Sequence, residues 1–553
     1  MEIAVVDSVT KTIGSLALAY PYLRRLGVAE TIDAVITKGK EREVPTGQVI
    51  EILVVNRLAV RPTPISKVSQ WATDQAVEEV YGIAAEALND DRIGRALDEI
   101  HPHLHGAWTT MVLAGVQAYG VCLDQLHSDV TRIAFEGSYD LPALPAGEDA
   151  AGPRITYGFT GKEDPTRKQL TVSLSVAADG ALPAWYQVAD GNAADCRAYP
   201  AHLAAVREHL HLDRPLMIGD SKLVSRSTML AFCRVQARFV GPARVTATDR
   251  VVLQAQWEAG VPMACLDPAP EGEGSRAGRY WGLEVSETLP DPEHTTVYAL
   301  RRLFVQSTDD RKAARHQRAK DLWRARRELR MIRGRLSRPA YRDRSLVERK
   351  VAQAVAKVTR YLVVEVTDGE QGLLVRWHLD HKQLREDERF DGLYCLLTNQ
   401  IQAEASSQEV FREYKGQSKV EGRFRGVKHP PLQIRPLWLH QPKRIESLLF
   451  VVMVALFLFA LIEREARRVV QETGQVFTGL RPEGRDQLPV TAERLFEVFG
   501  SLSLVKQRLR VGGESVELVT PATLSPIQAQ ILDRLKVMTP GAYLQPTITP
   551  YPT

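Results

Sequence analysis

The chain has 553 residues, of which 44% are hydrophobic, and a formal net charge of +4 at pH 7. This length predicts roughly three or four domains with real apolar cores, and the composition excludes wholesale disorder. The small net charge excludes a uniformly basic DNA-binding protein. Five scattered cysteines without a CxxC pair exclude a disulfide framework or a zinc knuckle, so a reducing cytoplasm is expected.

Residues 1–118 are expected to be helical. Apolar residues recur at helical spacing in residues 16–26, 46–58, 64–72, 77–87 and 91–100. Asn89 and the two aspartates that follow it form an N-cap cluster. Short helices joined by turns suit a helix-turn-helix DNA reader or a packing and dimerisation cap, and the sequence does not decide between the two.

From Tyr119 onwards the apolar pattern changes to that of strands. The expected elements are strands 126–135, 169–177 and 184–188, helix 199–209, strand 215–219, helix 227–236 and strand 238–241. Three strands followed by a helix, a strand and a helix is the order of an RNase H-like α/β fold. In open α/β sheets, function gathers at strand ends.

Two aspartates in this region are candidate site residues. Asp129 lies inside the first strand among apolar neighbours, where an unpaired charge would cost several kcal/mol. Asp220 directly follows the apolar strand PLMIG, at the carboxyl end where such sheets usually place function. Taken singly, each is better explained as a structural carboxylate, Asp129 in an ion pair or at a strand edge and Asp220 in a turn or loop.

The next region is basic. Residues 251–285 and 295–305 are expected to be β-rich, residues 321–360 to form an antiparallel helical hairpin, and residues 360–366 and 373–377 to return to strand. Residues 311–360 carry 18 Lys and Arg against 4 Asp and Glu, a local net charge of +14. This imbalance predicts an anionic partner rather than a merely solvated face. The candidate DNA contacts are Arg326, Arg327, Arg330 and Arg333.

Residues 410–428, VFREYKGQSKVEGRFRGVK, hold the most informative polar pattern. In a helix, which turns about 100° per residue, five side chains fall within an arc of about 80°: Tyr414, Gln417, Glu421, Arg425 and Lys428. Spacing alone favours a solvated face with a Glu421–Arg425 ion pair. A carboxylate beside several phosphate-seeking groups also suits metal-assisted phosphoryl chemistry. Three glycines weaken the helix prediction, at roughly 1 kcal/mol each.

The remaining sequence contains an apolar run and a small C-terminal module. Residues 448–462 are apolar and too short to span a bilayer comfortably, which predicts a buried core helix. Helices are expected at residues 491–499 and 525–535, and residues 502–509 and 514–520 are expected to pair around Gly512 and Gly513. Residues 540–553 are expected to be extended.

The stretch 410–428 also resembles the signature of a known family. Tyr414, Gln417, Glu421 and Lys428 match the spacing Tyr-x2-Arg-x3-Glu-x6-Lys, typical of a large superfamily of bacterial insertion-sequence transposases with an Asp-Asp-Glu active site. The departure is Gln417, where most of the superfamily has Arg. The segments DGLYCLLTN and IRPLWLHQPKRIESLLFVVMVALFLFALI are also similar to the family, and NRLAVRPTPISKVSQW and ALNDDRIGRALDEI resemble the N-terminal domain of one branch.

The resemblance implies an α/β fold with an RNase H-like catalytic core, interrupted by a β-rich and helical-hairpin insertion. The implied segments are a helical N-terminal domain for DNA binding or dimerisation, the first part of the core, a basic insertion, the second part of the core with the catalytic Glu helix, and a small C-terminal module. Their boundaries are 1–118, 119–245, 246–395, 396–470 and 471–553.

The resemblance also assigns roles to individual residues. Asp129, Asp220 and Glu421 would be the catalytic acids and the metal ligands. The family has an FEG-like sequence after the first Asp, here Phe135 to Gly137, and an apolar strand before the second. Asp195 in GNAADCRAY would be structural. Near the cleaved DNA end, phosphates would be held by Tyr414, Gln417, Arg425 and Lys428.

The activity implied is cut-and-paste DNA transposition. Two Mg²⁺ or Mn²⁺ ions at the three acids would activate a water, and later the 3′-hydroxyl of the cut strand, and would stabilise the leaving oxygen. The partners would be double-stranded DNA, as transposon inverted-repeat ends and as target, and a second copy in a synaptic homodimer. The expected location is the bacterial cytoplasm, at the nucleoid, without a membrane. The alternatives are a metal-dependent nuclease on the same fold and a domesticated, catalytically retired DNA-binding protein.

Overall fold

The computed structural model of the chain is a mixed α/β protein with a large mixed sheet. It describes residues 3–36, 44–135, 139, 152–158, 166–194, 197–267, 279–370, 372–428, 439, 441–481, 483–511, 514–521, 523–537 and 547–550. The chain divides into two compact units. The first unit is Met1–Lys222, Arg234–Ala237 and Gly416–Thr553, and the second is Leu223–Cys233 and Arg238–Lys415.

The N-terminal part of the first unit is a strand followed by helices. They are β1 (Ile3–Thr12), α1 (Leu16–Leu26), α2 (Val28–Val35), α3 (Thr46–Arg57), η1 (Ile65–Lys67), α4 (Val68–Asp74), α5 (Val77–Tyr81), η2 (Ala85–Leu88), α6 (Asp90–Ile100), η3 (His101–His103) and α7 (Leu104–Tyr119). Gly27, at a left-handed φ of 62°, ends α1 and lets α2 begin at once. The Asn89 side chain accepts the N–H of Arg92, which confirms the predicted cap of α6.

Helix α16 (Pro442–Thr473) is the apolar core helix of the first unit. It packs against α3, α6, α7 and β4. By length and composition it is the one described helix that could cross a membrane, but 89% of its most apolar window is buried inside the protein. This burial agrees with the predicted core helix.

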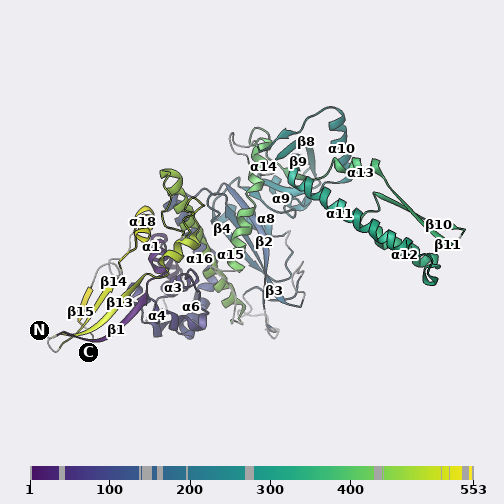
Figure 1. Ribbon diagram of the computed structural model, residues 1–553. Coiled ribbons are helices and arrows are strands. Elements are labelled where there is room, and N and C mark those ends of the chain that lie inside the picture. Colours follow the sequence, from purple (N-terminus) through teal and green to yellow (C-terminus); the bar gives the residue numbers. More distant parts are fainter. Residues whose placement is uncertain are drawn as a thin grey trace, which may run out of the picture. The chain divides into compact units, whose positions relative to one another are not determined.

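The first unit holds four strands in the order β4-β3-β2-β5. They are β2 (Gln125–Phe135), β3 (Lys168–Ala177), β4 (Pro183–Ala189) and β5 (Leu216–Ile218). Strand β2 is antiparallel to β3 and parallel to β5. Helix α8 (Ala198–His209) packs on β4, and α15 (Ser418–Lys428) packs on β2 and β3 (Figure 1). The predicted strands and the predicted helix 199–209 are confirmed.

A separate sheet in the first unit has the order β1-β13-β14-β15. Its other strands are β13 (Ser503–Val511), β14 (Glu514–Pro521) and β15 (Thr547–Pro550), and helices α17 (Ala492–Phe499) and α18 (Pro526–Arg534) belong to the same part of the chain. The predicted pairing of β13 with β14 is confirmed. The all-helical prediction for residues 1–118 is wrong at β1, because β1 pairs with β13 from the far end of the sequence.

In the second unit, five neighbouring strands follow the order β6-β12-β9-β8-β7. Its elements are α9 (Arg226–Arg234), β6 (Arg238–Ala243), α10 (Ala247–Glu258), β7 (Ala264–Cys265), β8 (Tyr280–Asp291), β9 (Thr296–Ser307), α13 (His381–Glu388), β12 (Leu393–Thr398) and α14 (Ser407–Lys415). The β-rich prediction is wrong over α10. Thr246 and Asp249 form a capping box there, and the buried Leu253 packs into an apolar cluster.

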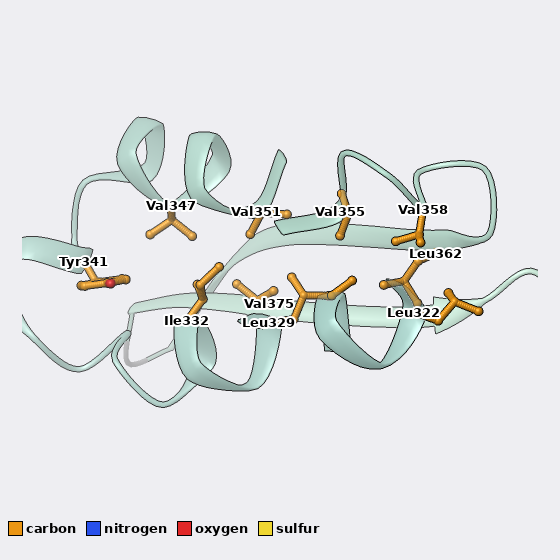
Figure 2. Close-up of a cluster of buried hydrophobic side chains, with 11 residues drawn as sticks. Leu322, Leu329, Ile332, Tyr341, Val347, Val351, Val355, Val358, Leu362 and Val375 are labelled. Atoms are coloured by element: carbon orange, nitrogen blue, oxygen red, sulfur yellow. The ribbon is translucent and has the colours of Figure 1, made fainter. Parts of the chain in front are cut away.

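The predicted helical hairpin is confirmed as an arm of the second unit. It consists of α11 (Thr308–Arg333), η6 (Pro339–Tyr341), α12 (Arg344–Val355), β10 (Leu362–Gly369) and β11 (Gly372–Leu379). Figure 2 shows valines of α12 pointing toward leucines and an isoleucine of α11. The arm therefore has its own apolar core, which is made by Leu322, Ala325, Leu329, Ile332, Tyr341, Val347, Val351, Val355, Val358, Leu362 and Val375.

Candidate active site

The two candidate aspartates lie on one strand and just beyond the end of its neighbour in the first unit. In the parallel pairing of β2 with β5, His127 is opposite Ile218. Asp129 lies two residues further along β2. Strand β5 ends at Ile218, and Asp220 lies beyond its end, after Gly219. Neighbouring strands lie about 4.8 Å apart, so the pairing brings the segments that carry Asp129 and Asp220 close together, although they are far apart in the sequence.

Tyr199 on α8 fixes the second aspartate. Its hydroxyl donates to Oδ1 of Asp220 at 2.8 Å and accepts the Asp220 N–H at 3.0 Å. Burial, then the negative charges of Asp220 and Asp129, raise the pKa of Tyr199 well above its usual value. The phenol therefore stays protonated and can donate. The hydrogen bonds that described groups donate to this carboxylate all reach Oδ1.

Gly219 makes room for this contact. A Cβ atom at Gly219 would lie 2.6 Å from Cε1 of Tyr199 and 2.7 Å from its hydroxyl oxygen. Real side chains do not approach so closely, and the Tyr199 ring is buried. The Gly-Asp pair at the end of β5 therefore serves two needs, a site for the carboxylate and space for the ring that holds it.

A buried serine–histidine network supports β2 from the other face of the strand. The hydroxyl of Ser128 lies 2.6 Å from that of Ser175, which lies 2.7 Å from Nδ1 of His202. Nε2 of His202 lies 2.6 Å from the hydroxyl of Ser173. Burial lowers the pKa of His202 to about 3, so the ring is neutral near pH 7. Ser128 directly precedes Asp129, and successive side chains of a strand point to opposite faces. The network therefore fixes the strand next to Asp129, from the face opposite to its side chain.

Glu421 lies in the first turn of α15 and is exposed to solvent. The partial positive charge at the start of a helix favours a carboxylate there. The helix is tied to the β3–β4 connection, because Lys419 donates to the carbonyl of Ala178 at 2.8 Å and Arg423 to that of Ala181 at 3.0 Å. Arg423 is buried and also pairs with Glu463 of α16 at 3.2 Å. Glu421 is thus an exposed acid on an anchored helix.

Gln417 occupies the turn just before α15. Its Nε2 donates to the carbonyl oxygen of Ser128 at 2.9 Å, and its side chain is half-buried. On the same segment of β2, burial and the charge of Lys419 lower the pKa of His127 to about 4, while a hydrogen bond with Gln417 opposes that shift. His127 is therefore neutral at pH 7, like the amide of Gln417 beside it.

The prediction of one continuous helix through residues 410–428 is wrong. Helix α14 ends at Lys415, Gly416 and Gln417 form a turn, and α15 begins at Ser418. A helix-weakening glycine falls at the break. Tyr414 consequently belongs to α14 in the second unit, where its ring centroid lies 6.5 Å from that of Tyr394.

The other predicted site residues divide between described and undescribed positions. Arg425 is exposed on α15, one turn after Glu421. Lys428 is the last residue of α15, but its side chain is not among the described ones. Glu136, Gly137 and Asp195 lie outside the described residues. Among the side chains that the structure does describe, no group of three or more His, Cys, Asp or Glu is close enough to hold a metal ion.

The chemistry of the donors nevertheless suits a hard divalent cation. Asp129, Asp220 and Glu421 supply carboxylate oxygens, which Mg²⁺ and Mn²⁺ prefer as ligands. Asp129 lies on β2 and Asp220 just past the end of the neighbouring β5, and the turn before the helix of Glu421 is hydrogen-bonded to the residue before Asp129. The three residues therefore have the oxygen donors that such an ion prefers, and they lie on or next to elements that contact one another.

The candidate DNA contacts of the arm lie along one side of α11. Arg327, Arg330 and Arg333 are exposed and Arg326 is half-buried. Trp323 on the same helix is 57% exposed, and the guanidinium of Arg327 lies 5.5 Å from its ring centroid. An exposed tryptophan among arginines, on a helix whose other side forms the arm core, is a surface suited to an anionic polymer.

Sequence reasoning missed Tyr199, His202 and the contact that Gln417 makes. Tyr199 lies in the segment GNAADCRAY, which the family resemblance drew attention to for Asp195 instead. The one available signal was its place at the start of a helix between two predicted strands. A hydrogen bond to an aspartate of another element has no sequence period, so spacing could not have revealed it.

Comparisons with known proteins give a family of undefined function and distant structural likenesses. A family model described as "Domain of unknown function (DUF4277)" matches residues 8–108. A piggyBac transposase synaptic complex with hairpin DNA shows a TM-score of 0.35 at 8% identity, covering 89% of this chain and 82% of that chain. No curated protein matches this chain.

Two Mos1 transposase structures are similar to a smaller part of this chain. A paired-end complex with the left transposon end has a TM-score of 0.15 at 13% identity, over 36% of this chain and 61% of that chain. A pre-cleavage transpososome has a TM-score of 0.15 at 12% identity, over 40% of this chain and 68% of that chain.

Proposed function

We propose that this protein is a DNA transposase that cleaves DNA at transposon ends and joins the cut strand to target DNA. One observation carries the proposal. Asp129 lies on β2 and Asp220 lies just past the end of the parallel neighbour β5, and the turn that leads into the helix of Glu421 is hydrogen-bonded to the residue before Asp129. Three carboxylates carried in this way are suited to metal-dependent phosphoryl transfer.

The order of elements supports an RNase H-like core. Strands β2, β3 and β4, helix α8, strand β5 and helix α9 follow one another as that fold requires. Between the second and third acids, residues 246–395 include α10, β7, β8, β9, the arm and α13. We take this stretch as an insertion in the core, with the acids on either side of it in sequence.

In the proposed mechanism, the carboxylates of Asp129, Asp220 and Glu421 would hold two Mg²⁺ or Mn²⁺ ions. When bound, the ions supply activation of the attacking water or 3′-hydroxyl and stabilisation of the leaving oxygen. Tyr199 keeps Oδ1 of Asp220 in a hydrogen bond, which orients the carboxylate. Glu421 is exposed and so can approach DNA and metal from the solvent side. No nucleophilic side chain is needed.

Double-stranded DNA is the proposed partner. The exposed arginines of α11 would contact phosphates along the duplex, because distributed cationic contacts supply most of the affinity for DNA. Near the cleaved bond, the proposed phosphate contacts are Arg425 and Lys428, which follow Glu421 on α15. Tyr414, at the end of α14, is a further proposed phosphate contact. A synaptic homodimer on two ends is part of the proposal.

The test is an assay of nicking and joining with a donor plasmid in which the gene's own flanking sequences bracket a marker. Asp129→Asn, Asp220→Asn and Glu421→Gln keep shape and remove one charge each. We expect each to abolish Mg²⁺-dependent nicking and joining, while affinity for the flanking DNA in a gel shift stays near that of the wild type.

Two exposed acids of the first unit provide matched controls, Asp213→Asn and Glu208→Gln. Both control variants are expected to nick and join normally. Nicking without joining by the wild type would show a nuclease instead of a transposase. DNA binding without nicking would show a retired DNA-binding protein.

A further inference from the structure

Gln417 sits at the junction between the helix of Glu421 and the strand of Asp129. The side chain leaves the turn before α15 and its Nε2 donates to the carbonyl oxygen of Ser128 at 2.9 Å. This carbonyl belongs to the peptide bond that joins Ser128 to Asp129. A displacement of the amide would therefore act on the backbone of a candidate metal ligand directly.

The same carbonyl also faces Tyr199. The Tyr199 hydroxyl lies 3.5 Å from the oxygen of Ser128, while it donates to Oδ1 of Asp220 at 2.8 Å. A carbonyl oxygen has two lone pairs and can face two donors. The peptide between Ser128 and Asp129 is thus the point where β2, α8 and the turn before α15 meet.

The environment of Gln417 argues against a contact with DNA phosphate. Its side chain is half-buried against β2, where its Nε2 donates to the carbonyl oxygen of Ser128. Glu421 and Arg425, one and two turns further along, are both exposed. A phosphate ligand would be expected on the exposed side with these two, and the amide points instead at the backbone of β2.

We propose that Gln417 is a positioning residue, which ties the start of α15 to the Ser128–Asp129 peptide and so sets the approach of Glu421 to the two aspartates. This role rests on the proposed function of the site. A carboxamide is suited to it because it donates to a carbonyl without bringing a charge beside the metal ligands. The arginine typical of the superfamily would bring one.

The test compares Gln417→Met, which keeps length and loses the donor, with Gln417→Glu, which keeps shape and places an anion against a carbonyl. Gln471→Met on the exposed end of α16 is the matched control. For each protein we would measure affinity for the flanking DNA, the nicking rate at saturating DNA over a Mg²⁺ titration, and Mn²⁺ binding to the DNA complex by electron paramagnetic resonance.

We expect Gln417→Met and Gln417→Glu to bind DNA within about twofold of the wild type. Partners that orient metal ligands typically contribute about 10- to 100-fold in metal affinity or activity, so both variants should need correspondingly more Mg²⁺ and bind Mn²⁺ more weakly. Gln471→Met should match the wild type in all three measurements.

Two results would overturn the role. Normal nicking and Mn²⁺ affinity in Gln417→Met would show that the contact positions nothing. Weaker DNA binding with normal nicking at saturating DNA would make Gln417 a phosphate ligand, as the sequence predicts. Failure of the wild type to nick at all would instead refute the proposed function, and the positioning role would fall with it.

Discussion

Replacing Tyr199 by phenylalanine should damage the site while the ring, and so the packing around it, stays in place. The change removes one hydroxyl, which donates to Asp220 at 2.8 Å and accepts the Asp220 N–H at 3.0 Å. A hydrogen bond to a charged group contributes about 1.5–3 kcal/mol, and a buried N–H left without an acceptor costs about 1–3 kcal/mol. Because the two effects share one group, we expect a loss of about 2–4 kcal/mol in the free energy of unfolding of the first unit.

The same variant should slow catalysis. A carboxylate freed from its orienting partner is expected to cost about 10- to 100-fold in metal affinity or activity. The assay is urea unfolding, followed by nicking at saturating flanking DNA over a Mg²⁺ titration. Tyr157→Phe, at an exposed ring, is the control and should change neither measurement. Wild-type nicking by Tyr199→Phe at low Mg²⁺ would refute the reasoning that Tyr199 orients a metal ligand.

Three further predictions follow from the described contacts. Burial lowers the pKa of His202 to about 3, so below about pH 6.5 the unfolded chain binds a proton that the folded one does not. Stability should therefore fall by about 1.4 kcal/mol per pH unit between about pH 6.5 and pH 4, and urea midpoints of His202→Gln should show a smaller fall. Gly219→Ala should push the Tyr199 ring away, because the added Cβ would lie 2.6 Å from it, and should slow nicking at least as much as Tyr199→Phe. The double variant Arg327→Gln, Arg330→Gln should lower the slope of log DNA affinity against log salt concentration by about 1.8. An unchanged slope would show that the two arginines face solvent only. The control is the double variant Lys382→Gln, Arg385→Gln.

The sequence predicted those elements whose pattern is local. Strand β2, strand β3 and helix α8 were predicted nearly to their ends because apolar residues alternate or recur within each segment. The hairpin of β13 and β14 was found for the same reason, together with its glycine turn. The aspartates were candidates because a charge within an apolar strand, or directly after one, is uncommon.

Elements that depend on distant partners were not found. Strand β1 is defined by its pairing with β13, nearly the whole chain away, and its own residues carry no clear period. Helix α10 contains a β-branched pair, and its capping box outweighs the strand propensity of those residues. The break at Gly416 divides a helix that the spacing of polar residues had joined. In the site, the roles of Tyr199 and Gln417 come from hydrogen bonds between elements, and no spacing rule describes these.

The most direct test of the central claim is metal mapping in the complex of the protein with its flanking DNA. Fe²⁺ replaces Mg²⁺ at carboxylate sites, and with peroxide and ascorbate it cuts the polypeptide beside the residues that bind it. If the three acids share a metal site, cuts are expected around residues 129, 220 and 421, all suppressed by excess Mg²⁺ and all weakened in Asp220→Asn. Cuts confined to other acidic residues, or at one of the three positions without the others, would contradict a shared metal site.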